Sequence, residues 1–348
     1  MGRGREVRDV VRRLGRNRLG APFDREDERN RGRGARRDRN GVRLAPRPEL
    51  GSVSQRLEAR LRVRYWGTSA RIDGTRSLRQ LPTPVRSSRL VVALVAIAAT
   101  VRADPPPALI GSTEDGRLLL FQADRPEAAR TVRPSGLSGR LVGIDSRPAD
   151  GHLYGLTTSN DLYRIDPATG ASTLVSTLTV PFDGDLRSGV AFNPQADRLR
   201  LVSADGQNLR VNVVLGATAV DTPLAYAPSD RNAGKRPRIA GAAYTNMVRD
   251  APTTKLFEID AEHDVLVLQD PPNDGLLTTI GALDADFASL SGFTIVTDAG
   301  GADRAYAATA GTLYTIDLTT GHATPVGPIG DPPVPLVSLA AVPGGRAP

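Results

Sequence analysis

A glycine recurs at near-constant spacing between residues 143 and 292. It stands at Gly143, Gly189, Gly241 and Gly292, each inside an apolar run, and Ser338 occupies the fifth place, so that the intervals are 46, 52, 51 and 46 residues. The first interval holds four short apolar runs separated by turn sequences such as Ala-Asp-Gly and Ala-Thr-Gly. A four-stranded antiparallel unit that repeats about every 40–50 residues is typical of propeller blades.

The repeat predicts an all-β, five-bladed β-propeller whose C-terminal strand closes the first blade. Full units are expected at residues 141–178, 188–226, 239–283 and 290–329. Ahead of them only three strands fit: ALIGST, RLLLFQA and ARTVRP. The missing strand is PLVSLAAV at residues 335–342, and we expect it to pair with ALIGST because closure removes a free sheet edge.

Charge divides the chain into unlike pieces. Residues 1–89 hold 25 Arg, no Lys and 10 acidic groups, a charge of +15, whereas residues 90–348 hold 20 basic and 28 acidic groups, a charge of −8. Residues 1–85 lack an apolar period, so this Arg-rich segment is expected to be disordered. One interpretation is an arm for RNA or acidic partners, and the other is a translation start that lies further downstream. The acidic region at residues 90–348 gives no reason to expect nucleic-acid binding.

Residues 86–103 have the order of a secretory signal peptide. A basic stretch, Arg86-Ser-Ser-Arg89, precedes twelve apolar residues at 90–101, and Val101-Arg102-Ala103 places small residues where cleavage occurs. Twelve residues rise about 18 Å as a helix, too little for a permanent membrane span. The mature domain is therefore expected at residues 104–348, in the periplasm or outside the cell. The alternative is a buried core segment. The chain has no Cys, so export would involve no disulfides.

Several long motifs resemble one bacterial family. They are GIDSRPADG, NDLYRIDPATG, FNPQADRLRLVS, GQNLRVN, AYTN and LQDPPNDG, at residues 143–275. In these motifs the chain resembles the family known as domain of unknown function 4394, over about residues 108–342. The resemblance implies a secreted or envelope-associated β-propeller and supplies no catalytic residues.

Catalytic patterns are sparse, and the catalytic residues are left unknown. There is no Gly-x-Ser-x-Gly motif, and His152, His263 and His322 stand apart at turns or strand starts, as ordinary surface residues do. Glu258 and Asp260 alternate onto one strand face as a glycosidase acid pair would, but other repeats carry turn residues in that place. The sequence therefore favours a binding module over an enzyme.

Acidic residues in turns raise the question of a cation. Asp183 and Asp185, Asp284 and Asp286, and Asn273 with Asp274 offer the oxygen ligands that Ca²⁺ prefers. None has EF-hand spacing, and Asp-Gly pairs usually form turns, so no cofactor is expected and Ca²⁺ is kept as an alternative.

Polar residues gather in the loops between blades and between middle strands. Asn208, Arg210 and Asn212 share one strand face by a period of two. Such a face is either a structural network or the wall of a ligand site. The candidate ligand-binding residues are Arg140, Asn160, Asp183, Asp185, Arg187, Asp205, Asn208, Arg210, Asn212, Asp230 and Asn232.

Two functional hypotheses follow. The first is an exported, monomeric binding or interaction module that takes an unknown protein or small molecule at the channel rim. The alternative is a hydrolase or lactonase with a cation bound in the channel.

Overall fold

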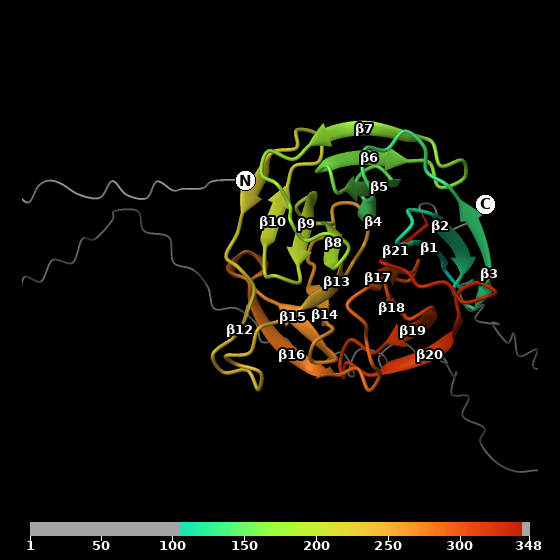
Figure 1. Ribbon diagram of the computed structural model, residues 1–348. Helices are drawn as coiled ribbons and strands as arrows, with labels where there is room; N and C mark the ends of the chain where they lie inside the picture. The colour runs from blue at the N-terminus through green and yellow to red at the C-terminus, as the bar shows by residue number, and fades with distance from the viewer. Residues whose placement is uncertain (1–104, 343–348) are drawn as a thin grey trace, which may run out of the picture. The chain divides into compact units, whose positions relative to one another are not determined.

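The computed structural model describes residues 105–342. The predictions for the Arg-rich segment 1–85 and the signal-peptide-like segment 86–103 lie outside the described residues. The described residues form five small sheets arranged in a ring, which confirms the predicted five-bladed β-propeller (Figure 1). Within residues 105–342 the single helical element is a 3-10 turn, η2 (Pro272–Asp274).

Each blade is a small, mainly antiparallel sheet. The first blade contains β1 (Ala108–Ser112), β2 (Leu118–Gln122), β3 (Arg125–Val132) and β21 (Ser338–Ala341). The second contains β4 (Leu141–Arg147), β5 (His152–Thr157), β6 (Asp161–Ile165) and β7 (Ser172–Thr177). The third contains β8 (Ser188–Asn193), β9 (Arg198–Ser203), β10 (Asn208–Val211) and β11 (Thr218–Val220). The fourth contains β12 (Ala225–Tyr226), β13 (Ile239–Tyr244), β14 (Leu256–Asp260), β15 (Val265–Gln269) and β16 (Leu276–Ala282). The fifth contains β17 (Ser291–Thr297), β18 (Asp303–Thr309), β19 (Thr312–Ile316) and β20 (Ala323–Pro328).

The C-terminal strand closes the ring as predicted. β21 pairs antiparallel with β1, and the register places Ser338 opposite Ser112 and Ala341 opposite Leu109. The first blade therefore combines strands from the two ends of the described chain, and each inner sheet edge faces the propeller axis instead of a free solvent edge.

The recurring glycines lie where the inner strands approach one another. β21, β4, β8, β13 and β17 surround the axis (Figure 1). A Cβ added to Gly292 would lie 2.7 Å from the Cβ of Leu339 on the next inner strand, and one added to Gly241 would lie 2.8 Å from the Cβ of Phe293. Only a glycine fits between strands this close. The spacing of 46–52 residues is thus the spacing of these contacts.

Most of the core lies between neighbouring blades. Both faces of each blade pack against another blade, and the buried apolar side chains form five clusters, one for each blade-to-blade interface. The interface between the third and fourth blades differs, because it also buries Arg200, Asn208, Glu258, Asp260 and Gln269. This interface is the polar one.

One strand assignment needs correction. The repeat predicts that residues up to Tyr226 belong to the third blade, but Ala225 and Tyr226 form β12, which pairs parallel with β16 of the fourth blade. Backbone hydrogen bonds from Ala225 N to Gly275 O and from Ala227 N to Leu277 O, both 2.9 Å, fix this position. The chain crosses to the outer edge of the next blade before its inner strand begins, so the apolar run 219–226 was split between two sheets.

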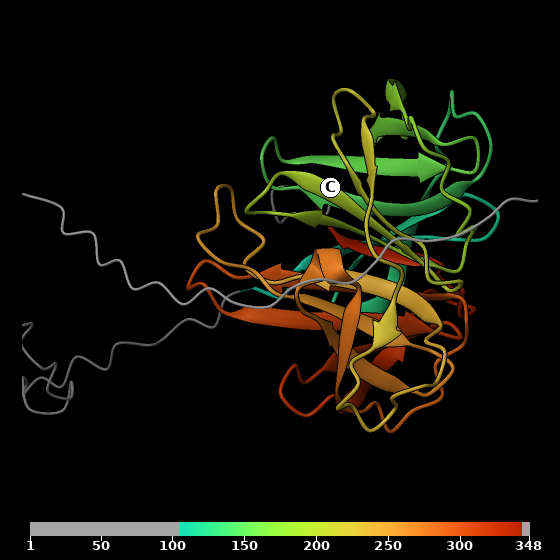
Figure 2. The ribbon, with the colours of Figure 1, turned by 90° about the vertical axis from the view of Figure 1, so that its left-hand side faces the viewer.

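The two ends of the ring carry different loops. We define the top face as the end where the inner strands begin; it carries the loops between blades and those between the second and third strands of each blade. The bottom face is the opposite end, where the inner strands finish. A view from the side shows loops projecting at both ends of the sheets (Figure 2).

Candidate functional site

A pocket opens on the top face beside the start of β13. It has a volume of about 280 Å³. Ile239 and Ala240 supply apolar lining, and Arg187, Arg238 and Glu262 supply charge. We call this the top pocket. It combines apolar lining with guanidinium and carboxylate groups, a pattern that suits a polar or charged ligand.

Buried Asp260 holds the rim of the top pocket in place. Its Oδ1 accepts hydrogen bonds from the backbone N–H of Arg238 at 3.2 Å and of Glu262 at 2.9 Å. Its Oδ2 accepts one from the hydroxyl of Tyr226 and lies 3.0 Å from Nδ1 of His263. Burial, together with the Asp260 carboxylate, raises the pKa of Tyr226, so this hydroxyl remains a donor. The rim backbone is therefore fixed before any ligand arrives.

Asp205 orients the basic side chains at the same rim. Its Oδ1 accepts from Arg236 at 3.1 Å and from Arg238 at 3.0 Å. All three side chains are exposed, so each ion pair adds little stability. Their effect is to orient the guanidinium of Arg238, which also lines the pocket.

Three of the predicted site residues fasten loops, one to another loop and two to strand β16. Asn160 accepts a hydrogen bond from the backbone N–H of Phe182 at 2.7 Å, which joins two loops of the top face. Asp230 accepts from the backbone N–H and the hydroxyl of Thr279, at 2.6 and 2.8 Å, and these bonds help to lower its pKa against the opposing effect of burial. Asn232, which is buried, donates to the hydroxyl of Thr279 at 3.1 Å.

Four others are exposed on the top face. Arg140 and Asp185 form an ion pair at 3.6 Å, and the backbone N–H of Asp183 donates to the side-chain oxygen of Gln207 at 3.1 Å. Arg187 lines the top pocket and, within residues 105–342, has no carboxylate partner. Of the eleven predicted residues, Arg187 is the one that lines this pocket. A ligand-binding role for the set stays a prediction.

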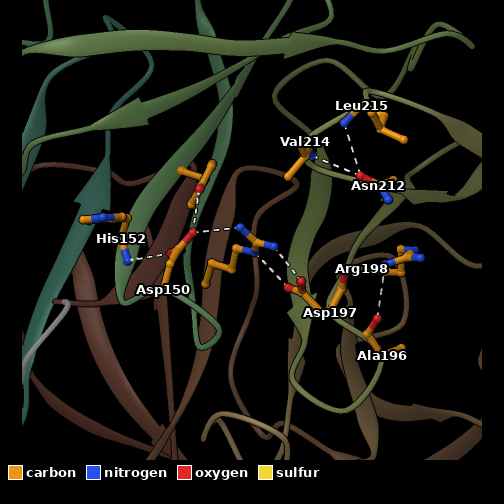
Figure 3. A network of polar contacts seen from close by, with 10 residues as sticks. Asp150, His152, Ala196, Asp197, Arg198, Asn212, Val214 and Leu215 are labelled. Atoms are coloured by element: carbon orange, nitrogen blue, oxygen red, sulfur yellow. Dashed lines mark hydrogen bonds and ion pairs between the residues drawn. The ribbon is translucent and has the colours of Figure 1, made fainter.

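The polar strand face predicted on β10 divides in the structure. Asn208 and Arg210 belong to the network between the third and fourth blades, whereas Asn212 follows the last residue of β10 and caps a turn. The Oδ1 of Asn212 accepts from the backbone N–H of Val214 at 3.1 Å and of Leu215 at 3.2 Å (Figure 3).

Arg238, Asp260 and Glu262 belong to the site, although the sequence did not predict them as site residues. Asp260 was considered as a glycosidase residue and set aside as a turn residue, yet its carboxylate is buried and bonded on both oxygens. His263 was expected to stand alone, and this expectation is wrong, because it contacts Asp260. The signal that could have identified Asp260 is an acidic residue inside a propeller strand. Both faces of such a strand are buried, and a buried charge needs a partner.

Residues 105–342 contain neither a cluster of metal-ligating side chains nor a membrane-spanning helix. In the described part of the chain, no three His, Asp or Glu side chains gather where they could hold a metal ion. Across residues 105–342 there is also no helix with the length and apolar character needed to span a bilayer.

Ring topology and pocket together define this protein as a five-bladed β-propeller with a charged pocket on its top face. Residues 117–340 match the family model described as Domain of unknown function (DUF4394), and the chain belongs to that family. None of the curated proteins matches the chain.

Solved structures share a partial likeness with the chain. One is a structural genomics protein of unknown function from Bacteroides thetaiotaomicron VPI-5482, with 18% identity, a TM-score of 0.40, and coverage of 64% of this chain and 58% of that one. Another is an auxiliary nutrient binding protein from the same organism, with 12% identity, a TM-score of 0.36, and coverage of 58% and 53%. A third is an auxiliary nutrient binding protein from Bacteroides ovatus ATCC 8483, with 10% identity, a TM-score of 0.36, and coverage of 59% and 55%. The chain spans 53–58% of the length of these proteins.

Proposed function

We propose that the protein is an exported binding or interaction module that receives its ligand or protein partner on the top face, over the top pocket. The observation that carries the proposal is the rim of this pocket. Arg187, Arg238 and Glu262 surround it, and Asp260 fixes the backbone of the last two. Groups that are fixed before binding lose little entropy when the partner arrives, which favours affinity.

Export rests on residues 86–103, with the order basic, apolar and small-x-small. The mature chain then begins at Asp104 and acts in the periplasm or outside the cell as a monomer. N-terminal sequencing of the native protein tests this step. A mature chain that still carries residues upstream of Arg86 would contradict export by this route.

A thermal-shift screen of the purified protein tests the binding proposal. The compounds are neutral and charged sugars, peptidoglycan fragments, lactones and Ca²⁺, and affinity capture from the envelope fraction covers protein partners. We expect a ligand or partner whose binding is lost in Arg187→Glu and kept in Arg198→Gln, which changes an arginine on the bottom face. Binding that is equal in both variants would contradict the top pocket as the site. Turnover of a lactone would instead support the enzyme alternative.

A further inference from the structure

A second pocket opens on the bottom face between the third and fourth blades. It has a volume of about 220 Å³, and its lining includes Arg198, Arg200, Arg210, Tyr244 and Asn273. We call it the arginine pocket. It lies at the opposite end of the propeller from the top pocket and shares no lining residue with it.

Arg200 forms the buried end of the arginine pocket. The residue is 2% exposed, and its guanidinium is held on three sides. It donates to Asn208 Oδ1 at 2.6 Å, to Asp221 Oδ2 at 2.7 Å and to Asn273 Oδ1 at 2.8 Å. A guanidinium fixed in this way keeps its charge in a poorly hydrated place, where electrostatic attraction is stronger than in water.

One carboxylate serves two of the three arginines. Arg210 binds Asp221 with two hydrogen bonds, of 2.6 and 2.9 Å, while the same carboxylate accepts from Arg200. Asp221 therefore balances one of these two positive charges. Arg210 is 40% exposed at its side chain, and its Nη1 has no hydrogen-bond partner among the described residues.

The third arginine has no carboxylate partner within residues 105–342. Arg198 donates to the carbonyl oxygens of Ala196 and Asp197, at 3.3 and 2.9 Å. The carboxylate of Asp197 is held instead by Arg147, at 2.8 and 2.5 Å (Figure 3). The pocket thus carries three guanidinium groups against the single carboxylate of Asp221.

Glu258 does not supply the missing negative charge. It lies in the same interface, is fully buried, and has no hydrogen-bond partner for either oxygen among the described residues. Burial raises the pKa of Glu258 to about 8. The charge of Asp260 also raises this pKa, and the charge of Arg200 lowers it. The carboxyl is therefore mainly neutral at pH 7.

We propose that the arginine pocket binds a small organic anion through its carboxylate or phosphate group, which the free N–H groups of Arg198 and Arg210 would receive. Guanidinium groups suit such oxyanions, because their parallel N–H bonds match two oxygens. The hydroxyl of Tyr244 and the amide of Asn273 also line the pocket and offer hydrogen bonds to the rest of the molecule. This binding site is independent of the top pocket and of the function proposed for it.

Isothermal titration calorimetry on the full chain tests the proposal. The probes are inorganic phosphate, gluconate as a carboxylate, and glucose as a neutral molecule close to gluconate in size, all at low ionic strength. We expect saturable binding of at least one anion and none of glucose. The Arg198→Gln and Arg210→Gln variants should each weaken anion binding by about tenfold, the effect of losing a charged hydrogen bond.

Arg133→Gln is the matched control, since it removes the same charge at an exposed position just after β3, outside both pockets, and should leave anion affinity unchanged. Circular dichroism establishes that each variant is folded. Because Arg198 is exposed, Arg198→Gln is the substitution least able to disturb folding. The absence of heat with both anions would overturn the proposal, as would equal affinity in wild type, Arg198→Gln and Arg210→Gln. Neither result would bear on the top pocket.

Discussion

The hydroxyl of Ser338 accepts a hydrogen bond from the backbone N–H of Ile144 at 3.1 Å and donates one to the carbonyl oxygen of Ile144 at 3.3 Å. The two residues are 194 positions apart and join β21 to β4 beside the axis. At the four other inner strands a glycine occupies this place. A Cβ there would meet backbone atoms of the next inner strand at Gly189, Gly241 and Gly292, and the side chain of Val190 at Gly143. A hydroxyl therefore joins the inner strands at one junction, and close packing against a glycine joins them at the other four.

We expect Ser338→Ala to lower the free energy of unfolding by about 1–3 kcal/mol, because the backbone N–H of Ile144 would remain buried without its partner. Chemical denaturation measures this loss. Ser112→Ala is the matched control: Ser112 lies opposite Ser338 in the ladder, and its buried hydroxyl has no partner among the described residues. An equal cost for both substitutions would contradict a specific role for the Ser338 bond.

Removal of residues 335–348 should abolish cooperative unfolding. The deletion takes away β21 and so exposes the edge of β1 as well as the inner faces of β4 and β17. Thermal unfolding followed by circular dichroism gives the measurement. A truncated chain that melts as the intact protein does would show that closure by β21 contributes nothing.

Gly292→Ala should destabilise the propeller by about 1–3 kcal/mol. The new Cβ would lie 2.7 Å from the Cβ and 2.8 Å from the backbone nitrogen of Leu339, and backbone atoms cannot swing aside. Gly327→Ala on β20 is the control, since the closest atom to its new Cβ, Pro126 Cγ, is 3.6 Å away. Urea denaturation of both variants tests the close packing of the inner strands; equal stability would refute it.

Glu258→Gln should raise the free energy of unfolding at pH 8 and reduce its dependence on pH. Because burial raises the pKa of Glu258 from 4.5 to about 8, the folded protein keeps a proton that the unfolded chain releases. The wild-type free energy of unfolding therefore falls as the pH rises between these values and levels off above them. The variant avoids this loss, a gain on the order of 4–5 kcal/mol, since each unit of pKa shift corresponds to about 1.4 kcal/mol.

Denaturation of wild type and Glu258→Gln from pH 5 to 9 measures the difference. Burial raises the pKa of Asp145 to about 7, so this residue also makes the free energy of unfolding fall as the pH rises. Asp145 is present in both proteins, so its effect cancels from the comparison. Parallel pH profiles would show that Glu258 is not the group responsible.

The ring could be predicted because its determinants are local and periodic. A glycine at Gly143, Gly189, Gly241 and Gly292 repeats once per blade. The remaining strand at residues 335–342 can complete only the first blade, which otherwise has three strands. Turn chemistry was equally readable. The side chain of Asp166 accepts from the backbone N–H of Ala168 at 2.8 Å, as the matching turn sequences predict.

The sites were harder to predict because they depend on which blades meet. Asn208 and Arg210 share a face as their spacing indicates, but sequence does not show that Arg200 and Asp221 complete the cluster from neighbouring strands and loops. Arg200 alternates with Leu199 and Leu201 in what looks like a strand with one exposed face. In a propeller both faces of that strand are covered, so this arginine is buried.

The closure of the first blade also determines how the ring should respond to mechanical force. β1 and β21 run antiparallel, and the backbone N–H of Val342 donates to the carbonyl oxygen of Ala108 at 2.9 Å, so residues 108 and 342 lie at the same end of this ladder. Tension applied between these two residues pulls in the unzipping geometry, in which the hydrogen bonds of the ladder break one after another. In the shear geometry all of them would be loaded together. The ring is therefore expected to yield first at β21, under low force, while the other four blades still hold their own hairpins.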